Sequence, residues 1–171
     1  MSITQKNINY EMYLDGGRQV GTVDVTLPNV QMMTTEVKGA GIAGTIDSPV
    51  LGHTQSMTGT VNFRTVTSEL RNLLQQRYQH IEFWGAVQTL DPATGQYVVK
   101  QHKIVWRATI KNNTLGNFNV GEAQGRSLEF EITYLKELFD NALVQEIDKL
   151  NYIHKVGGTD FLSSVRAAIG L

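Results

Sequence analysis

Apolar and polar residues alternate with a period of two along several stretches of the chain, which is the pattern of β-strands that bury one face. In residues 127–134 (SLEFEITY), for example, Leu128, Phe130 and Ile132 share one face, and the polar residues between them share the other. One-sided strands are typical of antiparallel sheets, because the strands of a parallel sheet are covered on both faces. The segments with this alternation are 21–27, 60–64, 103–111 and 127–134.

Turn residues separate these predicted strands. Residues 15–17 (DGG) and 91–95 (DPATG) combine Asp, Pro and Gly, which favour tight turns. We therefore predict a mainly β fold class (β-rich α+β), with antiparallel sheets forming a small sandwich or barrel. A chain of 171 residues is expected to form a single domain, residues 1–171.

Two stretches have the apolar spacing of helices instead. Residues 67–79 (TSELRNLLQQRYQ) place three leucines and a tyrosine on one stripe, and Ser68 is the expected N-cap. Residues 159–169 follow a Gly-Gly break, with Thr159 as the expected cap and Gly170 as the expected end of the helix. We predict one internal and one C-terminal helix.

Residues 135–152 fit two structures. Leu135, Leu138 and Phe139 have helical spacing, and intrinsic propensity favours a helix. Asp140-Asn141, however, also suits a hairpin turn, since both residues tolerate left-handed backbone. From the residues alone, the helix is the favoured prediction.

The composition excludes several classes of function. The chain has no cysteine, so disulfides, thiolate nucleophiles and Cys-based zinc sites are ruled out. Fifteen basic residues against sixteen acidic ones give a net charge of -1, whereas nucleic-acid binders are usually basic. No apolar run is long enough to span a membrane, and the start has no apolar signal-peptide core. We expect no membrane anchor and residence in the cytosol.

Charge is also unevenly distributed. Residues 98–111 carry four bases and no acid, whereas residues 122–160 carry eight acids and four bases. Such separation within one domain favours attraction between copies of the chain.

Residues 39–44 (GAGIAG) match the dinucleotide-binding fingerprint G-x-G-x-x-G. That fingerprint requires a following helix and an acid about 20 residues later. Here loop-forming residues follow, and no acid lies between Asp47 and Glu69. We interpret residues 39–56 as an extended glycine-containing loop that returns to a strand near Gln55 and packs against a partner. Its expected contact residues are Gly39, Ala40, Gly41, Gly44 and Pro49.

No catalytic constellation is visible. The four histidines share no metal-ligand spacing. Glu129 and Glu131 lie two residues apart on a predicted strand and point to the same wet face, which favours a solvated face over an acid–base pair. We expect no enzyme activity, no cofactor and no metal site. The pattern indicates a self-assembling structural subunit.

The C-terminal run EIDKLNYIHKVGGTDFLSSVRAAIGL (146–171) resembles the closing segment of the major tail tube proteins of contractile-tailed bacteriophages and the related R-type bacteriocins. Segments 13–16, 25–28 and 36–44 are similar to the family in the same order, and the similarity is loosest between about 75 and 125. The C-terminal pattern is carried by Glu146-Ile147-Asp148, Asn151, Ile153, Lys155, Val156, Gly158, Asp160 and Ile169-Gly170-Leu171.

The resemblance implies hexameric rings that stack into a tube inside a contractile sheath, with strands of every subunit joined in one ring-wide β-barrel. It implies a hairpin at 136–150 that turns at Asp140-Asn141, and a glycine loop that reaches the neighbouring ring. The implied cargo is DNA, which passes without specific binding, or a tape-measure protein. The other implied partners are the sheath protein, the baseplate or tube initiator and the tail terminator. The implied location is the virion, after assembly in the bacterial host cytoplasm.

A passive conduit for DNA should repel phosphate or bind it weakly. Alternation shows which residues share a strand face but not what that face contacts. A position of Glu129 and Glu131 against the sheath or the solvent is therefore the alternative to the lumen. Two other functions also stay open: a soluble ligand-binding β-barrel with an apolar cavity, and the tube of a non-phage injection system such as an R-type bacteriocin or a type VI secretion system. The candidate lumen-facing residues are Glu129, Glu131, Thr58, Thr60 and Asn62.

Overall fold

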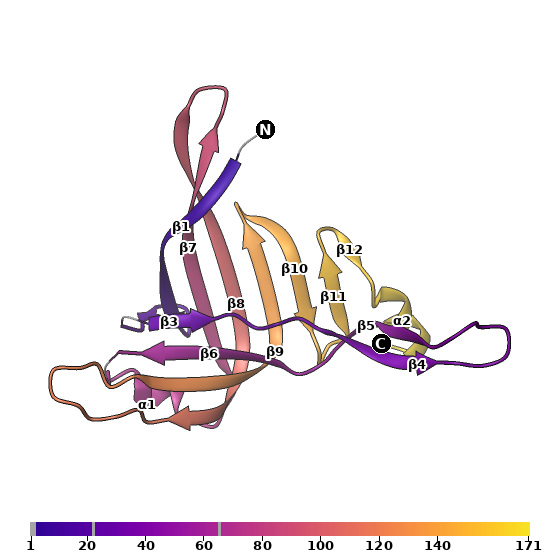
Figure 1. Ribbon diagram of the computed structural model, residues 1–171, viewed down its shortest axis with the longest axis horizontal. Helices are drawn as coiled ribbons and strands as arrows, with labels where there is room; N and C mark the ends of the chain where they lie inside the picture. Colours follow the sequence, from indigo (N-terminus) through magenta and orange to yellow (C-terminus); the bar gives the residue numbers. More distant parts are fainter. Residues whose placement is uncertain (1–2, 22, 65) are drawn as a thin grey trace.

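The computed structural model describes residues 3–21, 23–64 and 66–171 (Figure 1). Strands dominate this part of the chain, and every strand pair in it is antiparallel, which confirms the predicted mainly β class. The helices are α1 (Leu70–Leu73) and α2 (Ser163–Ile169). The strands are β1 (Ile3–Leu14), β2 (Arg18–Gln19), β3 (Val23–Thr26), β4 (Met32–Val37), β5 (Ile46–Thr54), β6 (Met57–Phe63), β7 (Gln79–Asp91), β8 (Gln96–Thr114), β9 (Arg126–Phe139), β10 (Ala142–Asp148), β11 (Ile153–Val156) and β12 (Thr159–Asp160).

One bent sheet holds most of the strands, in the order β12-β11-β10-β9-β8-β7-β1-β2, with β6 paired to β9 and β3 paired to β6. The long strands β8 and β9 curve through the molecule (Figure 1). Two register shifts interrupt their pairing, between Arg107 and Ala108 and between Ile110 and Asn112. Bulges of this kind bend a strand, so one half of β9 pairs with β6 and the other half with β10.

The core lies against the inner face of this bent sheet and follows from the alternation of the strands. On β6, Met57, Gly59, Val61 and Phe63 are buried, and the polar residues that alternate with them are half-buried. Trp106 of β8 is fully buried and meets Phe83 edge-on, with 4.5 Å between ring centroids. The other buried apolar residues come mainly from β1, β7, β9 and α1.

Gly59 makes room for Trp106. A Cβ atom at position 59 would lie 2.5 Å from the Trp106 Cη2 atom. We expect Gly59→Ala to lower the free energy of unfolding by about 1–3 kcal/mol, because the indole is enclosed and has to shift. Urea denaturation of the monomer measures this, with Gly17→Ala as the control, since a Cβ at Gly17 meets nothing within 4 Å. Equal stability of the two variants would contradict the packing described.

Both helices are shorter than predicted. The expected helix over 67–79 is reduced to Leu70–Leu73, because the chain turns into β7 at Gln79. The Gln79 side chain, almost fully buried, donates to the carbonyl oxygens of Leu73 at 2.7 Å and Gln75 at 2.9 Å and so occupies carbonyls at the end of the helix. Ser68 does not cap it; the N-cap position is Glu69, which makes no side-chain cap hydrogen bond.

The C-terminal helix begins at Ser163 rather than Thr159. Thr159 and Asp160 instead pair with β11 as β12, which overturns Thr159 as the helix cap. The predicted end is confirmed, since Gly170 has a left-handed φ of 80° and closes the helix.

Residues 135–148 form a β-hairpin, so the helix favoured by local propensity is wrong and the hairpin implied by the family resemblance is confirmed. Phe139 of β9 pairs with Ala142 of β10 across a two-residue turn. Asp140 and Asn141 have φ values of 51° and 64°, as a type I′ turn requires. Long-range pairing of both strands into the sheet outweighs the helical spacing of their leucines.

Candidate assembly surfaces

The five predicted lumen-facing residues lie on one face of the sheet. The register places Thr58 opposite Glu131 and Thr60 opposite Glu129. Asn62 lies opposite Ser127 in the same ladder. All these positions are half-buried and alternate with buried core residues on β6 and β9. The sequence therefore grouped these residues correctly, and the structure shows that they form a continuous polar face turned away from the core.

Lys111 is the member of this polar face that the sequence did not reveal. It stands at the second register shift of β8, and its Nζ atom lies 3.5 Å from Glu129 and 3.9 Å from Glu131. Ser56 donates from Oγ to the Glu131 carboxylate at 2.6 Å. The lysine thus offsets part of the negative charge. The alternation of residues 103–111 places Lys111 on the polar side of its own strand. A β-bulge, which alternation does not predict, decides that this lysine lies beside Glu129 and Glu131.

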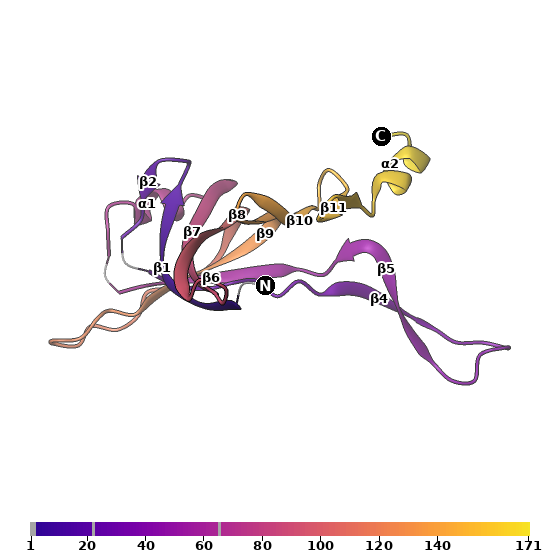
Figure 2. The same ribbon diagram turned by 90° about the horizontal axis from the view of Figure 1, so that it is seen from above.

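The predicted glycine loop is a β-hairpin, here called the arm, made of β4, β5 and the tip at 38–45. Figure 2 shows it projecting away from the main sheet. The expectation of an extended loop through residue 56 is wrong in one respect, because the second strand begins at Ile46 and not near Gln55. The absence of a helix after the glycines is confirmed, since β5 follows them. A two-stranded hairpin on its own is marginally stable, so the arm is suited to packing against a partner.

The predicted contact residues lie at the tip and on β5. Gly39, Ala40, Gly41 and Gly44 occupy the tip, and Pro49 pairs with Thr34. A Cβ atom at any of these three glycines would meet nothing within 4 Å. Gly41 and Gly44 have φ values of 94° and 131°, so these glycines serve the backbone turn and not a close approach within the subunit.

The base of the arm is held by the C-terminal segment. Gly52 has a φ of 66°, and Leu162 packs so closely on it that a Cβ atom there would lie 2.5 Å from Leu162 Cδ2. The buried His154 ring donates from Nδ1 to the Gly52 carbonyl at 3.1 Å. Lys149 donates from Nζ to the Gln55 carbonyl at 2.7 Å. The arm therefore leaves the subunit from a fixed seat on β11 and the start of α2.

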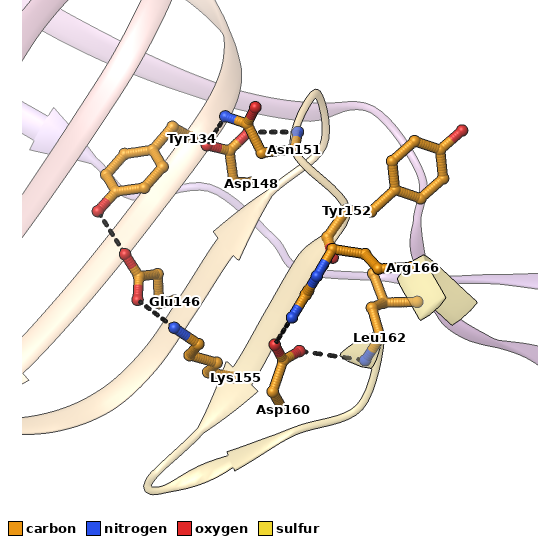
Figure 3. Close-up of polar contacts among 9 residues, drawn as sticks. All are labelled: Tyr134, Glu146, Asp148, Asn151, Tyr152, Lys155, Asp160, Leu162 and Arg166. Atoms are coloured by element: carbon orange, nitrogen blue, oxygen red, sulfur yellow. Dashed lines mark hydrogen bonds and ion pairs between the residues drawn. The ribbon is translucent and has the colours of Figure 1, made fainter. Parts of the chain in front are cut away.

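Figure 3 shows the polar contacts that build this seat. Arg166 of α2 donates to the Tyr152 carbonyl at 2.6 Å and to the Asp160 carboxylate at 2.7 Å. The Arg166 guanidinium holds the pKa of Asp160 below its usual value. The backbone N–H of Leu162 also donates to Asp160, at 3.1 Å. These contacts fix the start of α2 and hence the position of Leu162.

Residues that carried the family resemblance supply the neighbouring contacts. Asp148 accepts from the backbone N–H groups of Leu150 and Asn151 at 3.0 and 3.1 Å. It also accepts from the Asn151 side chain at 2.7 Å (Figure 3). Tyr134 donates from Oη to Glu146 at 2.7 Å, and Lys155 lies 3.8 Å from the same carboxylate. Burial, followed by the bond to Glu146, raises the pKa of Tyr134. The motif residues thus shape the C-terminal turns.

Glu82 is the centre of a separate charge cluster on β7 and β8. It accepts from Trp84 at 2.7 Å and pairs with Lys103 at 2.9 Å and with His80 at 2.8 Å. Burial acts to raise the pKa of Glu82, but the hydrogen bonds from Lys103, His80 and Trp84 outweigh it and lower the pKa to about 2. Within the described residues no three His, Asp or Glu side chains gather as metal ligands would.

The lowered pKa of Glu82 predicts a pH-dependent contribution to stability. The contribution is complete above the ordinary value of 4.5 and is lost as the pH falls towards 2. At pH 7 we expect Glu82→Gln to lower Tm by about 2–5 °C, and below pH 2 we expect the difference to vanish. Thermal unfolding followed by circular dichroism measures it. Glu36→Gln is the control, because the Glu36–Lys38 pair is exposed and should contribute little. A pH-independent Tm difference would contradict this account.

The fold and these surfaces define a class: a β-structured subunit with a projecting arm and an open polar face. Neither helix in the described part of the chain has the length and hydrophobicity that crossing a membrane requires.

Comparison with known proteins identifies the family. The model of the family described as phage tail tube protein FII matches residues 5–170, and the chain belongs to this family. The chain is 29% identical over 178 aligned positions, and over the full length of both proteins, to the tail tube protein of Escherichia phage P2.

Two solved structures share the fold. Both are chains of the extracellular contractile injection system PVC in its extended state. The sheath/tube terminator matches with a TM-score of 0.54 at 14% identity, over 76% of this chain and 93% of that one. A chain of the sheath–tube complex matches with a TM-score of 0.51 at 13% identity, over 75% and 86% respectively. The chain is therefore a structural tail tube protein of the contractile-tail type, and the ligand-binding barrel is not favoured.

Proposed function

We propose that the chain forms hexameric rings which stack into the hollow inner tube of a contractile tail. The tube conducts DNA, or a tape-measure protein, towards the host cell. The observation that carries this proposal is the arm: a two-stranded hairpin, exposed along all of β4, that leaves the subunit from a rigid seat. Such a projection gains its stability from a neighbouring copy, and Gly39, Ala40, Gly41, Gly44 and Pro49 make that contact in the next ring.

Open strand edges support joining of subunits within a ring. In the described part of the chain β1 pairs with β2 only at Tyr13 and Leu14, which leaves the edge from Ile3 to Asn9 without a neighbouring strand. An edge of this length invites pairing with another chain, and closing a ring removes such edges. We infer that the sheets of six subunits continue into one ring-wide β-barrel.

The polar face of β6 and β9 lines the lumen in this proposal. Glu129 and Glu131 supply negative charge, and Thr58, Thr60 and Asn62 supply neutral polar groups. A wall of this kind lets phosphates pass without tight binding. The tube requires no catalysis and no cofactor.

The other partners follow from the architecture of such a tail. They are the sheath protein around the tube, a baseplate or tube initiator, a tape-measure protein and a tail terminator. Assembly takes place in the bacterial host cytoplasm, and the product is part of the virion. The PVC chain matched here comes from a structure described as a sheath–tube complex, which supports the sheath as a partner.

Electron microscopy of negatively stained protein tests the proposal. We expect hollow rings or stacked tubes at high protein concentration, or on addition of a purified baseplate as nucleus. Small particles that do not polymerise even on the baseplate would overturn it.

A further inference from the structure

A second projection, the loop 115–125 between β8 and β9, presents apolar side chains to solvent. Phe118 is 93% exposed, and Val120 is fully exposed. Large apolar side chains that stand free in this way mark interaction sites. The loop was not singled out by the sequence, because its apolar residues follow no strand or helix period.

Hydrogen bonds hold this loop in a defined shape. The backbone N–H of Asn117 donates to the Gln124 carbonyl at 2.9 Å, and the Gln124 side chain donates to the Leu115 carbonyl at 2.8 Å. The backbone N–H of Gln124 also donates to the Arg64 carbonyl at 3.0 Å, which ties the loop to the end of β6. Gly116 has a φ of 77°, and a Cβ atom there would collide with the Gln124 carbonyl. Phe118 is therefore held exposed by a loop whose shape is fixed by hydrogen bonds.

The loop and the arm lie at opposite ends of the longest axis of the molecule. Figures 1 and 2 both show the 115–125 loop at one end of that axis and the tip of the arm at the other. When copies follow one another head to tail along this axis, the arm of one copy reaches the loop of the next. A contact between two different surfaces of the same chain builds rings or filaments.

The two ends have matching chemistry. On one side of the arm, Val37 pairs with Ile46 across the strands, and both are exposed. On the other side, Glu36 lies directly opposite Asp47. Lys38 pairs with Glu36 at 3.0 Å, so Asp47 is the carboxylate on this side that has no ion pair among the described residues. Ile42 at the tip is also an exposed apolar residue.

The loop end offers the complementary groups. Phe118 and Val120 are apolar, and Arg64 stands at the base of the loop. Arg71 belongs to α1. The residues just after α1 and the last residues of β8, which lead into the loop, line one groove. Both arginines are exposed, and neither makes an ion pair within residues 3–21, 23–64 and 66–171.

We propose that the tip of the arm docks on the 115–125 loop of the next copy. Phe118 and Val120 pack on the Val37, Ile42 and Ile46 side of the arm, and Arg64 and Arg71 face the Glu36–Asp47 pair. The inference rests on the proposed tube and names the surface that receives the arm.

Crosslinking in assembled tubes tests the docking, because a chain without cysteine gives an unambiguous background. The variant Ile42→Cys with Phe118→Cys is polymerised on a purified baseplate and treated with a short bismaleimide. We expect a ladder of covalent dimers and higher species on a denaturing gel. The matched control is Ile42→Cys with Tyr97→Cys, since Tyr97 is 65% exposed but lies on the β7–β8 hairpin, and it should stay monomeric.

The outcomes separate the two proposals. Tubes that form without the Ile42–Phe118 ladder overturn the docking site and leave the tube intact. A ladder of equal intensity with Tyr97 also overturns it. Wild-type protein that never polymerises on the baseplate overturns the proposed function itself, and the docking with it.

Charge reversal gives an independent readout in the same full-length chain. Glu36→Lys with Asp47→Lys should slow tube elongation at least tenfold, and adding Arg64→Glu with Arg71→Glu should restore it. Circular dichroism of each monomer checks that it is folded. Folded reversal variants that elongate at the wild-type rate, or a fourfold variant that stays slow, would overturn the docking.

Discussion

Shortening the arm is expected to abolish tube assembly while the subunit stays folded. Val37 and Ile46 are directly paired, so residues 38–45 can be replaced by Asn-Gly, the two-residue turn that suits a hairpin. The core does not include any residue of this tip. We therefore expect the Tm of the monomer to change by no more than about 2 °C. Tube growth on a baseplate, counted by electron microscopy, should fall below detection, because the contact with the next copy is lost.

Ala93→Ser is the control for this deletion. It lies in the exposed 91–95 turn, outside the arm, and it should polymerise as the wild type does. Tubes of normal length from the shortened chain would show that the arm is dispensable and would remove the observation that carries the proposed function.

Reversing the charge of the polar face is expected to slow DNA delivery without blocking assembly. Glu129→Lys with Glu131→Lys adds two positive charges beside Lys111, which now lies 3.5 and 3.9 Å from the two carboxylates. In the proposed hexameric ring, six subunits repeat this change, so a phosphate backbone would meet a strongly attractive wall. We expect delivery by otherwise intact tails to slow by about tenfold or more, measured as the rate of DNA release into vesicles or cells.

The variant Glu129→Gln with Glu131→Gln tests whether delivery slows because the new lysines attract phosphate or because the carboxylates are lost. This variant removes the negative charge and adds none of the opposite sign, so delivery should be much closer to wild type. Normal delivery by the lysine variant would exclude this face from the lumen. Loss of sheath binding in the same variant would place it on the outside of the tube instead.

The sequence alone predicted the faces of the strands well. Alternation placed Thr60 and Asn62 on one face of their strand and Glu129 and Glu131 on one face of theirs, and the ladder between β6 and β9 shows that these two faces are continuous. This succeeds because a strand has a period of two, so burial of one residue sets the face of every neighbour. The turn at 91–95 was predictable for a similarly local reason, because Asp91 accepts hydrogen bonds from the Ala93 N–H and the Thr94 hydroxyl within the turn itself.

The sequence failed where distant segments compete with local preference. Residues 67–79 have good helical spacing, but Gln79 pairs with Ala108 in the sheet and its side chain occupies carbonyls at the end of α1. Residues 135–148 also have helical spacing, yet they form β9 and β10. In both cases strands far apart in the sequence gain more from pairing in one sheet than the isolated segment gains as a helix.

What the sequence determined by itself is therefore local: which residues share a strand face, where the tight turns lie, and that residues 39–44 do not open a nucleotide site. Tertiary structure decided the rest. It made β5 out of a stretch with loop composition, because β4 lies beside it and Leu162 and His154 hold its base at Gly52. It also brought Lys111 to the glutamates. The physical reason is that register shifts and strand neighbours depend on contacts across the chain, which no local pattern of residues records.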